Sequence, residues 1–252
     1  MDKSGERSVV VTGGGRGIGA ATSRLCAARG WAVAVNYAHD GAAAEAIVDE
    51  LRAAGGRAVA VQADVASEAA VVELFARVDR ELPPLYGLVN NAGVVDQALR
   101  VEAITAARLE RMFAINVFGS FYCARESVRR MATDRGGSGG SIVNLSSAAA
   151  RLGGAGNYVD YAASKGAIDS FTIGLAKEVA GLGIRVNAVR PGLIETEIHA
   201  SGGQPGRARE LAPQVPMLRT GSAEEVAEAI VWLLGPGASY CTASFIDVGG
   251  GR

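Results

Sequence analysis

Short apolar segments alternate with helix-like segments along almost the whole chain. The strand-like segments are continuous apolar runs, which is typical of strands that a parallel sheet buries on both faces. They are Ser8–Val11, Ala32–Val35, Ala58–Gln62, Leu85–Val89, Ser141–Leu145, Arg185–Val189 and Ser244–Val248. The helix-like segments are Ile18–Arg29, Gly41–Ala54, Glu68–Leu82, Arg108–Met131, Tyr158–Ala180 and Ala223–Leu234. This alternation predicts an α/β fold, a doubly wound parallel sheet of about seven strands with helices on both faces.

The length of the chain allows one large α/β domain or two small ones. The sequence shows no internal repeat and no sign of a second domain, so we expect a single domain over residues 1–252. The longest irregular segment runs from about Glu195 to Ser222. An irregular loop of this length in a compact domain is more often functional than a plain connection. We therefore expect residues 195–222 to form a lid over a substrate.

Charge and composition exclude several classes of protein. A net charge of -1 provides no long-range attraction to nucleic acid or to anionic lipid. No apolar run reaches the roughly 18 residues of a membrane-spanning helix, and the polar N-terminal segment has no apolar core of a secretory signal. The cysteines, Cys26, Cys123 and Cys241, are too widely spaced for a zinc motif. We expect a cytoplasmic protein with reduced thiols, no metal site, no nucleic-acid partner and no membrane association.

The first strand leads into a glycine-rich loop, Thr12–Gly19, that opens a helix. The free N–H groups and the positive dipole end of that helix would face the loop, so a phosphate could bind where the backbone allows close approach. The spacing of Gly13, Gly17 and Gly19 is G-x-x-x-G-x-G rather than G-x-G-x-x-G. The alternative is a turn without a ligand, but the position after the first strand favours a dinucleotide site.

Two residues bear on the choice of dinucleotide. An acidic side chain at the end of the second strand would accept the ribose 2′-hydroxyl of NAD, but Asn36 and Tyr37 occupy this place. Asp40 lies four residues after Asn36 at the end of this strand, so we interpret it as an ordinary loop residue and not as the partner of the ribose. Arg16 in the glycine loop offers positive charge, and the Asn36 amide offers a donor, to a 2′-phosphate. Together they predict a preference for NADP(H) over NAD(H).

Tyr161 and Lys165 are four residues apart at the start of a predicted long helix, so their side chains share one face. A nearby ammonium favours the phenolate and would lower the pKa of the tyrosine, which then exchanges a proton near neutral pH. By spacing alone, a half-buried tyrosine beside a surface lysine is the commoner explanation.

Taken in order, these motifs resemble the short-chain dehydrogenase/reductase family, including 3-oxoacyl reductases and sugar dehydrogenases. The resemblance covers nearly the whole chain and implies a single Rossmann domain. It rests on Thr12–Gly19, Asp64-Val65, Asn90-Asn91-Ala92-Gly93, Asn116, Ser146-Ser147, Tyr161 with Lys165, and Pro191-Gly192 with Thr196.

The resemblance also implies roles for the catalytic candidates. Tyr161 would protonate the carbonyl oxygen during reduction, and Lys165 would hold the nicotinamide ribose and lower the tyrosine pKa. Asn116 would hold a water in a proton relay. Either Ser146 or Ser147 would bind the substrate oxygen; adjacent residues point to opposite sides of a strand, and we choose Ser147. Tyr158 is a candidate for the substrate pocket.

The same resemblance implies a cofactor site. Its predicted residues are Gly13, Arg16, Gly17, Ile18, Gly19, Asn36, Asp64, Val65, Asn90, Ala92, Gly93, Tyr161, Lys165, Pro191, Gly192, Ile194 and Thr196.

The sequence thus predicts an oxidoreductase that moves a hydride between NADP(H) and a small carbonyl or alcohol, and a homotetramer. The alternative is a nucleotide-binding or sensing protein of the same fold without catalysis. A reductase serving an acidic acyl carrier protein would need basic residues at the mouth of its pocket. Arg129, Arg130 and Arg135 are candidates, although a solvated helix end is the simpler explanation for them.

Overall fold

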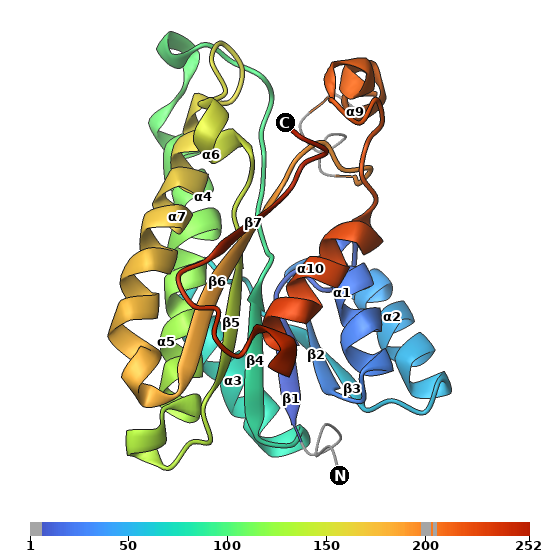
Figure 1. Cartoon of the computed structure of the whole chain (residues 1–252), viewed down its shortest axis with the longest axis vertical. Helices are drawn as coiled ribbons and strands as arrows, with labels where there is room; N and C mark the ends of the chain where they lie inside the picture. The colour runs from blue at the N-terminus through green and yellow to red at the C-terminus, as the bar shows by residue number, and fades with distance from the viewer. Residues whose placement is uncertain (1–6, 198–202, 204–205) are drawn as a thin grey trace.

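The computed structural model describes residues 7–197, 203 and 206–252, and contains the predicted parallel sheet. Its strands lie in the order β3-β2-β1-β4-β5-β6-β7, and every neighbouring pair is parallel (Figure 1). They are β1 (Ser8–Val11), β2 (Ala32–Tyr37), β3 (Ala58–Gln62), β4 (Leu85–Asn90), β5 (Gly140–Leu145), β6 (Ile184–Pro191) and β7 (Phe245–Val248). This parallel sheet confirms the predicted fold class. Its strands are apolar and buried on both faces, so helices must cover both sides of the sheet.

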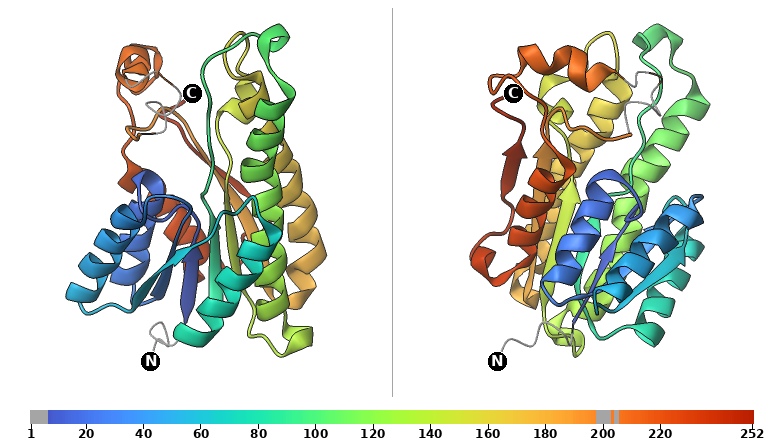
Figure 2. Two further views of the ribbon diagram at one scale, coloured as in Figure 1. Left: turned by 180° about the vertical axis from the view of Figure 1, so that it is seen from behind. Right: turned by 90° about the vertical axis from the view of Figure 1, so that its right-hand side faces the viewer.

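Two layers of helices cover the sheet, as the two views of Figure 2 show. One face carries α1 (Gly17–Ala28), α2 (Gly41–Ala53) and α10 (Ala223–Leu234), whose apolar residues share one core cluster with strand residues such as Val33 and Val35. The other face carries α3 (Glu68–Glu81), α5 (Gly119–Met131) and α7 (Val159–Val179), which share a second cluster around Phe75 and Ile142. Alternate strand residues feed the two clusters.

The strand order reverses at β1, because the chain builds β1, β2 and β3 toward one edge and β4 to β7 toward the other. In doubly wound sheets, ligands bind beyond the carboxyl ends of the strands at this reversal. The short helices α6 (Ala149–Leu152) and α9 (Arg207–Leu211) lie at this end of the molecule (Figure 1).

The predicted long helix at Arg108–Met131 is interrupted. It consists of α4 (Ala106–Phe113), a π-helical turn η3 (Ala114–Phe118) and α5. Periodicity cannot detect such a turn, because one inserted residue shifts the apolar stripe without erasing it. Turns of this kind are frequent at functional sites, and Asn116 lies inside this one.

Two loop predictions can be compared with the structure. The Asp40 carboxylate accepts a hydrogen bond from the Ala43 N–H at 3.0 Å and so caps α2, which fits its interpretation as an ordinary loop residue.

The expected lid, residues 195–222, contains α9 and a 3-10 turn at Ala212–Gln214. Residues 198–202 and 204–205 of this segment lie outside the described residues. No helix in the described ranges is both long enough and apolar enough to span a membrane.

Candidate active site

A cavity of about 890 Å³ lies at the carboxyl ends of the strands. It extends from the residues that follow β2 and β3 to Leu211 on α9. Most of the predicted site residues line it. These are Gly13, Arg16, Gly17, Ile18, Asn36, Asp64, Val65, Ala92, Gly93, Ser147, Tyr161, Lys165, Pro191, Gly192, Ile194 and Thr196. Gly19, Asn90 and Asn116 are absent from its described walls.

The glycine loop forms a cradle that side chains would fill. Gly13 and Gly17 have φ values of +61° and +49°, a left-handed conformation that favours glycine. A Cβ atom on Gly17 would lie 3.3 Å from Cγ2 of Thr196, across the cavity wall. Gly19 acts differently from our prediction, because a Cβ there would overlap the Gly13 carbonyl oxygen and force the loop away from α1. The cradle fits the phosphates of a dinucleotide at the start of α1.

Asn36 supports this loop with a buried side chain that is 1% exposed. Its Oδ1 accepts a hydrogen bond from the Gly13 N–H at 3.3 Å. Its Nδ2 donates to the carbonyl oxygens of Val61 at 3.3 Å and Ala63 at 2.9 Å. Both amide hydrogens therefore have acceptors within the protein, and the predicted donation from Asn36 to a 2′-phosphate has no support in this geometry.

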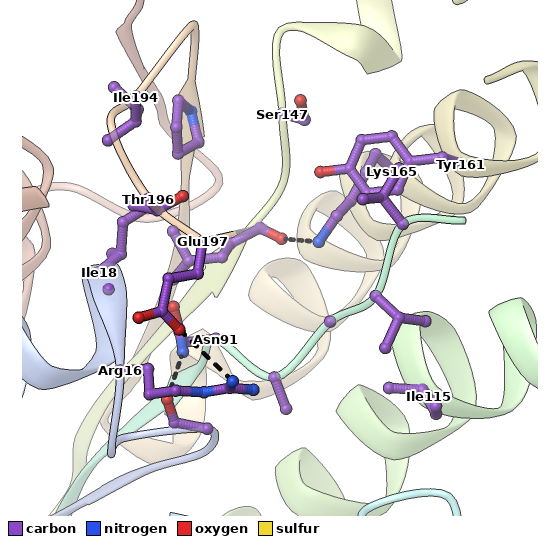
Figure 3. Close-up of a pocket in the computed structure, with 18 of the residues that line it drawn as sticks. Arg16, Ile18, Asn91, Ile115, Ser147, Tyr161, Lys165, Ile194, Thr196 and Glu197 are labelled. Carbon is purple, nitrogen blue, oxygen red and sulfur yellow. Dashed lines mark hydrogen bonds and ion pairs between the residues drawn. The ribbon is translucent and has the colours of Figure 1, made fainter. Parts of the chain in front are cut away.

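The side chains of Asn90 and Asn91 point in opposite directions. Asn90 is 4% exposed, and its Nδ2 donates to Oδ1 of Asn144 on β5 at 2.9 Å. The Asn90 side chain therefore makes a hydrogen bond in the protein interior and does not face the cavity as a cofactor contact would require. Asn91 lines the cavity instead, and its Nδ2 donates to the carbonyl oxygens of Thr12 at 2.8 Å and Gly13 at 3.1 Å (Figure 3). The motif pointed to this segment, and alternation along the strand decides which asparagine faces the cavity.

Tyr161 and Ser147 face each other on one wall of the cavity (Figure 3). The Ser147 side chain, which follows β5, makes a hydrogen bond with Tyr161 in the first turn of α7. Ser146 is 3% exposed, and its hydroxyl donates to the Lys165 carbonyl oxygen at 3.3 Å. Of the two serines, Ser147 is therefore the one placed to share a ligand atom with Tyr161.

Lys165 lies beside Tyr161, with Nζ 5.7 Å from the centroid of the tyrosine ring. Its ammonium donates to the Leu145 carbonyl oxygen at 2.7 Å, which fixes it between β5 and α7. Burial lowers the pKa of Lys165 to about 8, and the nearby charge of Asp169 opposes this shift.

The pKa of Tyr161 is raised above its ordinary value, which contradicts the predicted lowering by Lys165. Burial of the phenol is the main cause, and the hydrogen bond with Ser147 acts in the opposite direction. Spacing along a helix cannot reveal this balance, because it carries no information on desolvation. Burial thus favours the neutral phenol of Tyr161 over its phenolate.

Asn116 is 1% exposed in the π-helical turn. Its Oδ1 accepts from the Val94 N–H at 2.8 Å, and its Nδ2 donates to Oγ of Ser164 on α7 at 3.1 Å. A Cβ on Gly93 would lie 3.4 Å from Asn116 Oδ1 and 3.5 Å from Lys165 Nζ, so both side chains flank Gly93. Asn116 ties the loop after β4 to the helix of Tyr161, and its predicted water relay stays a prediction.

Comparison with known proteins assigns the fold and site to one family. The family model described as enoyl-(acyl carrier protein) reductase matches residues 13–252. A protein of Escherichia coli (strain K12), "Uncharacterized oxidoreductase YgfF", is 56% identical over 96% of this chain and 98% of its own length. The chain belongs to the short-chain dehydrogenase/reductase family.

Further relatives agree with this short-chain dehydrogenase/reductase assignment and with an oxidoreductase that acts on CH–OH or carbonyl groups. A 3-oxoacyl-[acyl-carrier-protein] reductase of Synechocystis sp. is 36% identical over 96% of this chain and 95% of its own length. The crystal structure of a short chain dehydrogenase from Burkholderia cenocepacia J2315 in complex with NADP is 30% identical. It covers 99% of both chains with a TM-score of 0.90.

The structure also places residues of this short-chain dehydrogenase/reductase that sequence reasoning weighed or missed. Tyr158, a candidate for the substrate pocket, lines the cavity. The basic residues considered for a carrier protein do not line it; Arg129 and Arg130 instead pair with Glu126 at 2.7 Å and 2.9 Å. No motif in the sequence marks the following lining residues, which come from loops or the ends of elements: His39, Asp96, Arg111, Leu211 and Arg252.

Proposed function

We propose that this protein is an NADP(H)-dependent oxidoreductase that interconverts a carbonyl and an alcohol on a small molecule, with Tyr161 as general acid and base. The observation that carries the proposal is the pairing of Tyr161 and Ser147 on one wall of a cavity whose other part is the glycine cradle. A protein that only senses a nucleotide has no need of a paired tyrosine and serine, so this pair favours catalysis over sensing.

The chain offers a group for each part of the cofactor. The backbone of Gly13 to Ile18 would hold the pyrophosphate, and Arg16 would face the 2′-phosphate. Lys165 would hold the nicotinamide ribose, and the segment from Pro191 to Thr196 would position the nicotinamide ring. When bound, the nicotinamide supplies or accepts the hydride.

In the direction of reduction, Ser147 donates a hydrogen bond to the substrate oxygen and orients the carbonyl beside Tyr161. As the carbonyl carbon gains the hydride, negative charge develops on this oxygen, and Tyr161 transfers its phenolic proton to it. The reverse reaction removes that proton from the alcohol. The Lys165 ammonium opposes the negative charge left on the Tyr161 oxygen.

The relative from Burkholderia cenocepacia, which was crystallised with NADP, supports the choice of cofactor, as does the absence of a carboxylate at position 36. Residues 195–222 would act as the lid, since Thr196, Glu197 and Leu211 of this segment line the cavity.

The proposal is tested by following NADPH oxidation with a panel of a ketone, an aldehyde, an acyl thioester and a sugar, each repeated with NADH. We expect turnover of at least one carbonyl. Tight binding of NADPH without oxidation across the panel would favour the sensing alternative.

A further inference from the structure

Arg252 lines the cavity beyond the last strand of the sheet. Its backbone N–H donates to the Gly249 carbonyl oxygen at 3.2 Å, so the chain turns back toward the site after β7. Gly249 packs closely on Gly192, where a Cβ would lie 2.6 Å from the Gly249 Cα. This close packing places the segment of Arg252 against the end of β6, and Figure 1 shows the chain ending above the sheet near α9.

The strand order sets this position apart from the part of the cavity that lies at the ends of β2 and β3. Asn36 at the end of β2, His39 after β2 and Asp64 after β3 line the cavity at one side of the sheet. The segment of Arg252 follows β7 at the opposite edge. The Ala148 N–H, next to Ser147, donates to the Pro191 carbonyl oxygen at 2.9 Å and so links β6 to the catalytic wall. Arg252 is therefore on the substrate side.

Arg252 differs from the other arginines in the cavity wall, because each of those pairs with a carboxylate. Arg16 pairs with Glu197 at 3.5 Å, and Arg111 pairs with Asp96 at 3.7 Å. Within the described part of the chain, Nη1 of Arg252 is buried without a hydrogen-bond partner, and its guanidinium makes no ion pair. A buried donor without an acceptor is costly, and the cost is greater for a charged group.

The planar fork of a guanidinium matches a carboxylate or a phosphate, which can accept two parallel hydrogen bonds. Leu193 and Leu211 also line the cavity, so water would be partly displaced around such a contact, which strengthens it.

We infer that Arg252 anchors the substrate, and that the carbonyl compounds used by this enzyme carry an anionic group, a carboxylate or a phosphate. This inference rests on the proposed function and adds a substrate class to it.

The test compares carbonyls that differ only in charge. The pairs are 4-oxopentanoate with its methyl ester, and dihydroxyacetone phosphate with dihydroxyacetone, each reduced with NADPH by wild type, Arg252→Met and Arg252→Lys. For at least one pair we expect wild type to prefer the anionic member by about 10-fold or more in kcat/KM, as for a charge-assisted hydrogen bond. The pair that shows the preference identifies carboxylate or phosphate as the anion.

Arg252→Met should abolish that preference through KM, while the neutral member and the Kd of NADPH change by no more than about twofold. Arg252→Lys should retain most of the preference, because it keeps the charge. The inference is overturned if Arg252→Met leaves the preference intact, or if its only effect is weaker binding of NADPH.

A binding measurement separates failure of the anchor from failure of the proposed function. Calorimetric titration of 4-oxopentanoate and of inorganic phosphate into the NADP⁺-loaded enzyme should give heat with wild type and none with Arg252→Met. This result supports the anchor even if no carbonyl is reduced, in which case the proposed function fails alone. Absent or equal binding in both proteins overturns the anchor, and turnover of neutral ketones would then still support the proposed function.

Discussion

The guanidinium of Arg108 holds the carboxylate of Asp160, the residue directly before Tyr161. Nε and Nη2 of Arg108 lie 2.6 Å and 3.2 Å from the two oxygens of Asp160. The side chains are only 7% and 0% exposed. Nη1 of Arg108 also donates to the Gln97 carbonyl oxygen at 2.6 Å. One buried ion pair thus joins α4, the loop after β4 and the first turn of α7, and so holds Tyr161 in place.

We predict that Arg108→Met lowers the free energy of unfolding by about 3–5 kcal/mol, because it leaves the Asp160 charge buried without a partner. Urea unfolding at pH 7 measures this change. The double variant Arg108→Met/Asp160→Leu should recover much of the loss, since it removes both charges. A double variant as unstable as the single one would contradict this explanation.

We predict that Tyr161→Phe lowers turnover by at least about 100-fold with little change in the affinity for NADPH, because proton transfer is lost while the ring still packs. Steady-state rates and a fluorescence titration of NADPH measure the two effects. Tyr158→Phe, in the same cavity, is the matched control and should retain far more activity. Near-wild-type turnover in Tyr161→Phe would remove the proposed mechanism.

The fold and the catalytic wall were predictable because their signals are local. Continuous apolar strands indicate a parallel sheet. The six predicted helices begin and end within two residues of the predicted bounds, apart from the π-helical turn, whereas the short helices α6 and α9 were not predicted. The role of Asn36 was not predictable. Its side-chain amide donates hydrogen bonds to the carbonyl oxygens of Val61 in β3 and of Ala63 just after it, and only the folded sheet brings these groups close to Asn36. Arg252 was missed for a related reason, since it follows a strand at the far edge and no motif marks it.

We predict that kcat/KM for carbonyl reduction falls as pH rises through about 8, the pKa of Lys165. The ammonium is present below this pKa and is lost above it, and with it the group that binds the ribose and stabilises the Tyr161 phenolate. A pH profile of kcat/KM with NADPH measures the fall. In Lys165→Arg, which stays charged, any remaining activity should not fall in this range. A wild-type profile that is flat through this range would contradict the assignment.

We predict that the protein forms a homotetramer through the faces of α5 and α7. Phe121 of α5 is 46% exposed and Ile173 of α7 is 39% exposed, and Phe118, in the π-helical turn directly before α5, is 50% exposed. Phe121 stacks on Phe171 of α7 at 3.8 Å between ring centroids, so the apolar surface is continuous across the two helices. Ile173→Glu should reduce the mass measured by light scattering, whereas Ala46→Glu on the exposed face of α2 should not. A wild-type monomer at micromolar concentration would refute the prediction.

The last prediction concerns Arg16 and the preference for NADPH. Arg16 is well exposed, and its pair with Glu197 at 3.5 Å is weak enough to yield to a 2′-phosphate. We expect wild type to prefer NADPH, and Arg16→Met to lower the ratio of kcat/KM for NADPH over NADH by about 10-fold, the lower end for charge-assisted hydrogen bonds at an exposed rim.

Arg29→Met is the control for this ratio, because Arg29 is an exposed arginine on the described surface outside the cavity wall and pairs with Glu228. Asn36→Asp, the obvious choice from sequence, is a poor probe, since it would turn a buried carboxylate toward the carbonyl oxygens of Val61 and Ala63 and destabilise the fold. Preference of wild type for NADH, or an unchanged ratio in Arg16→Met, would mean that the 2′-phosphate site lies elsewhere.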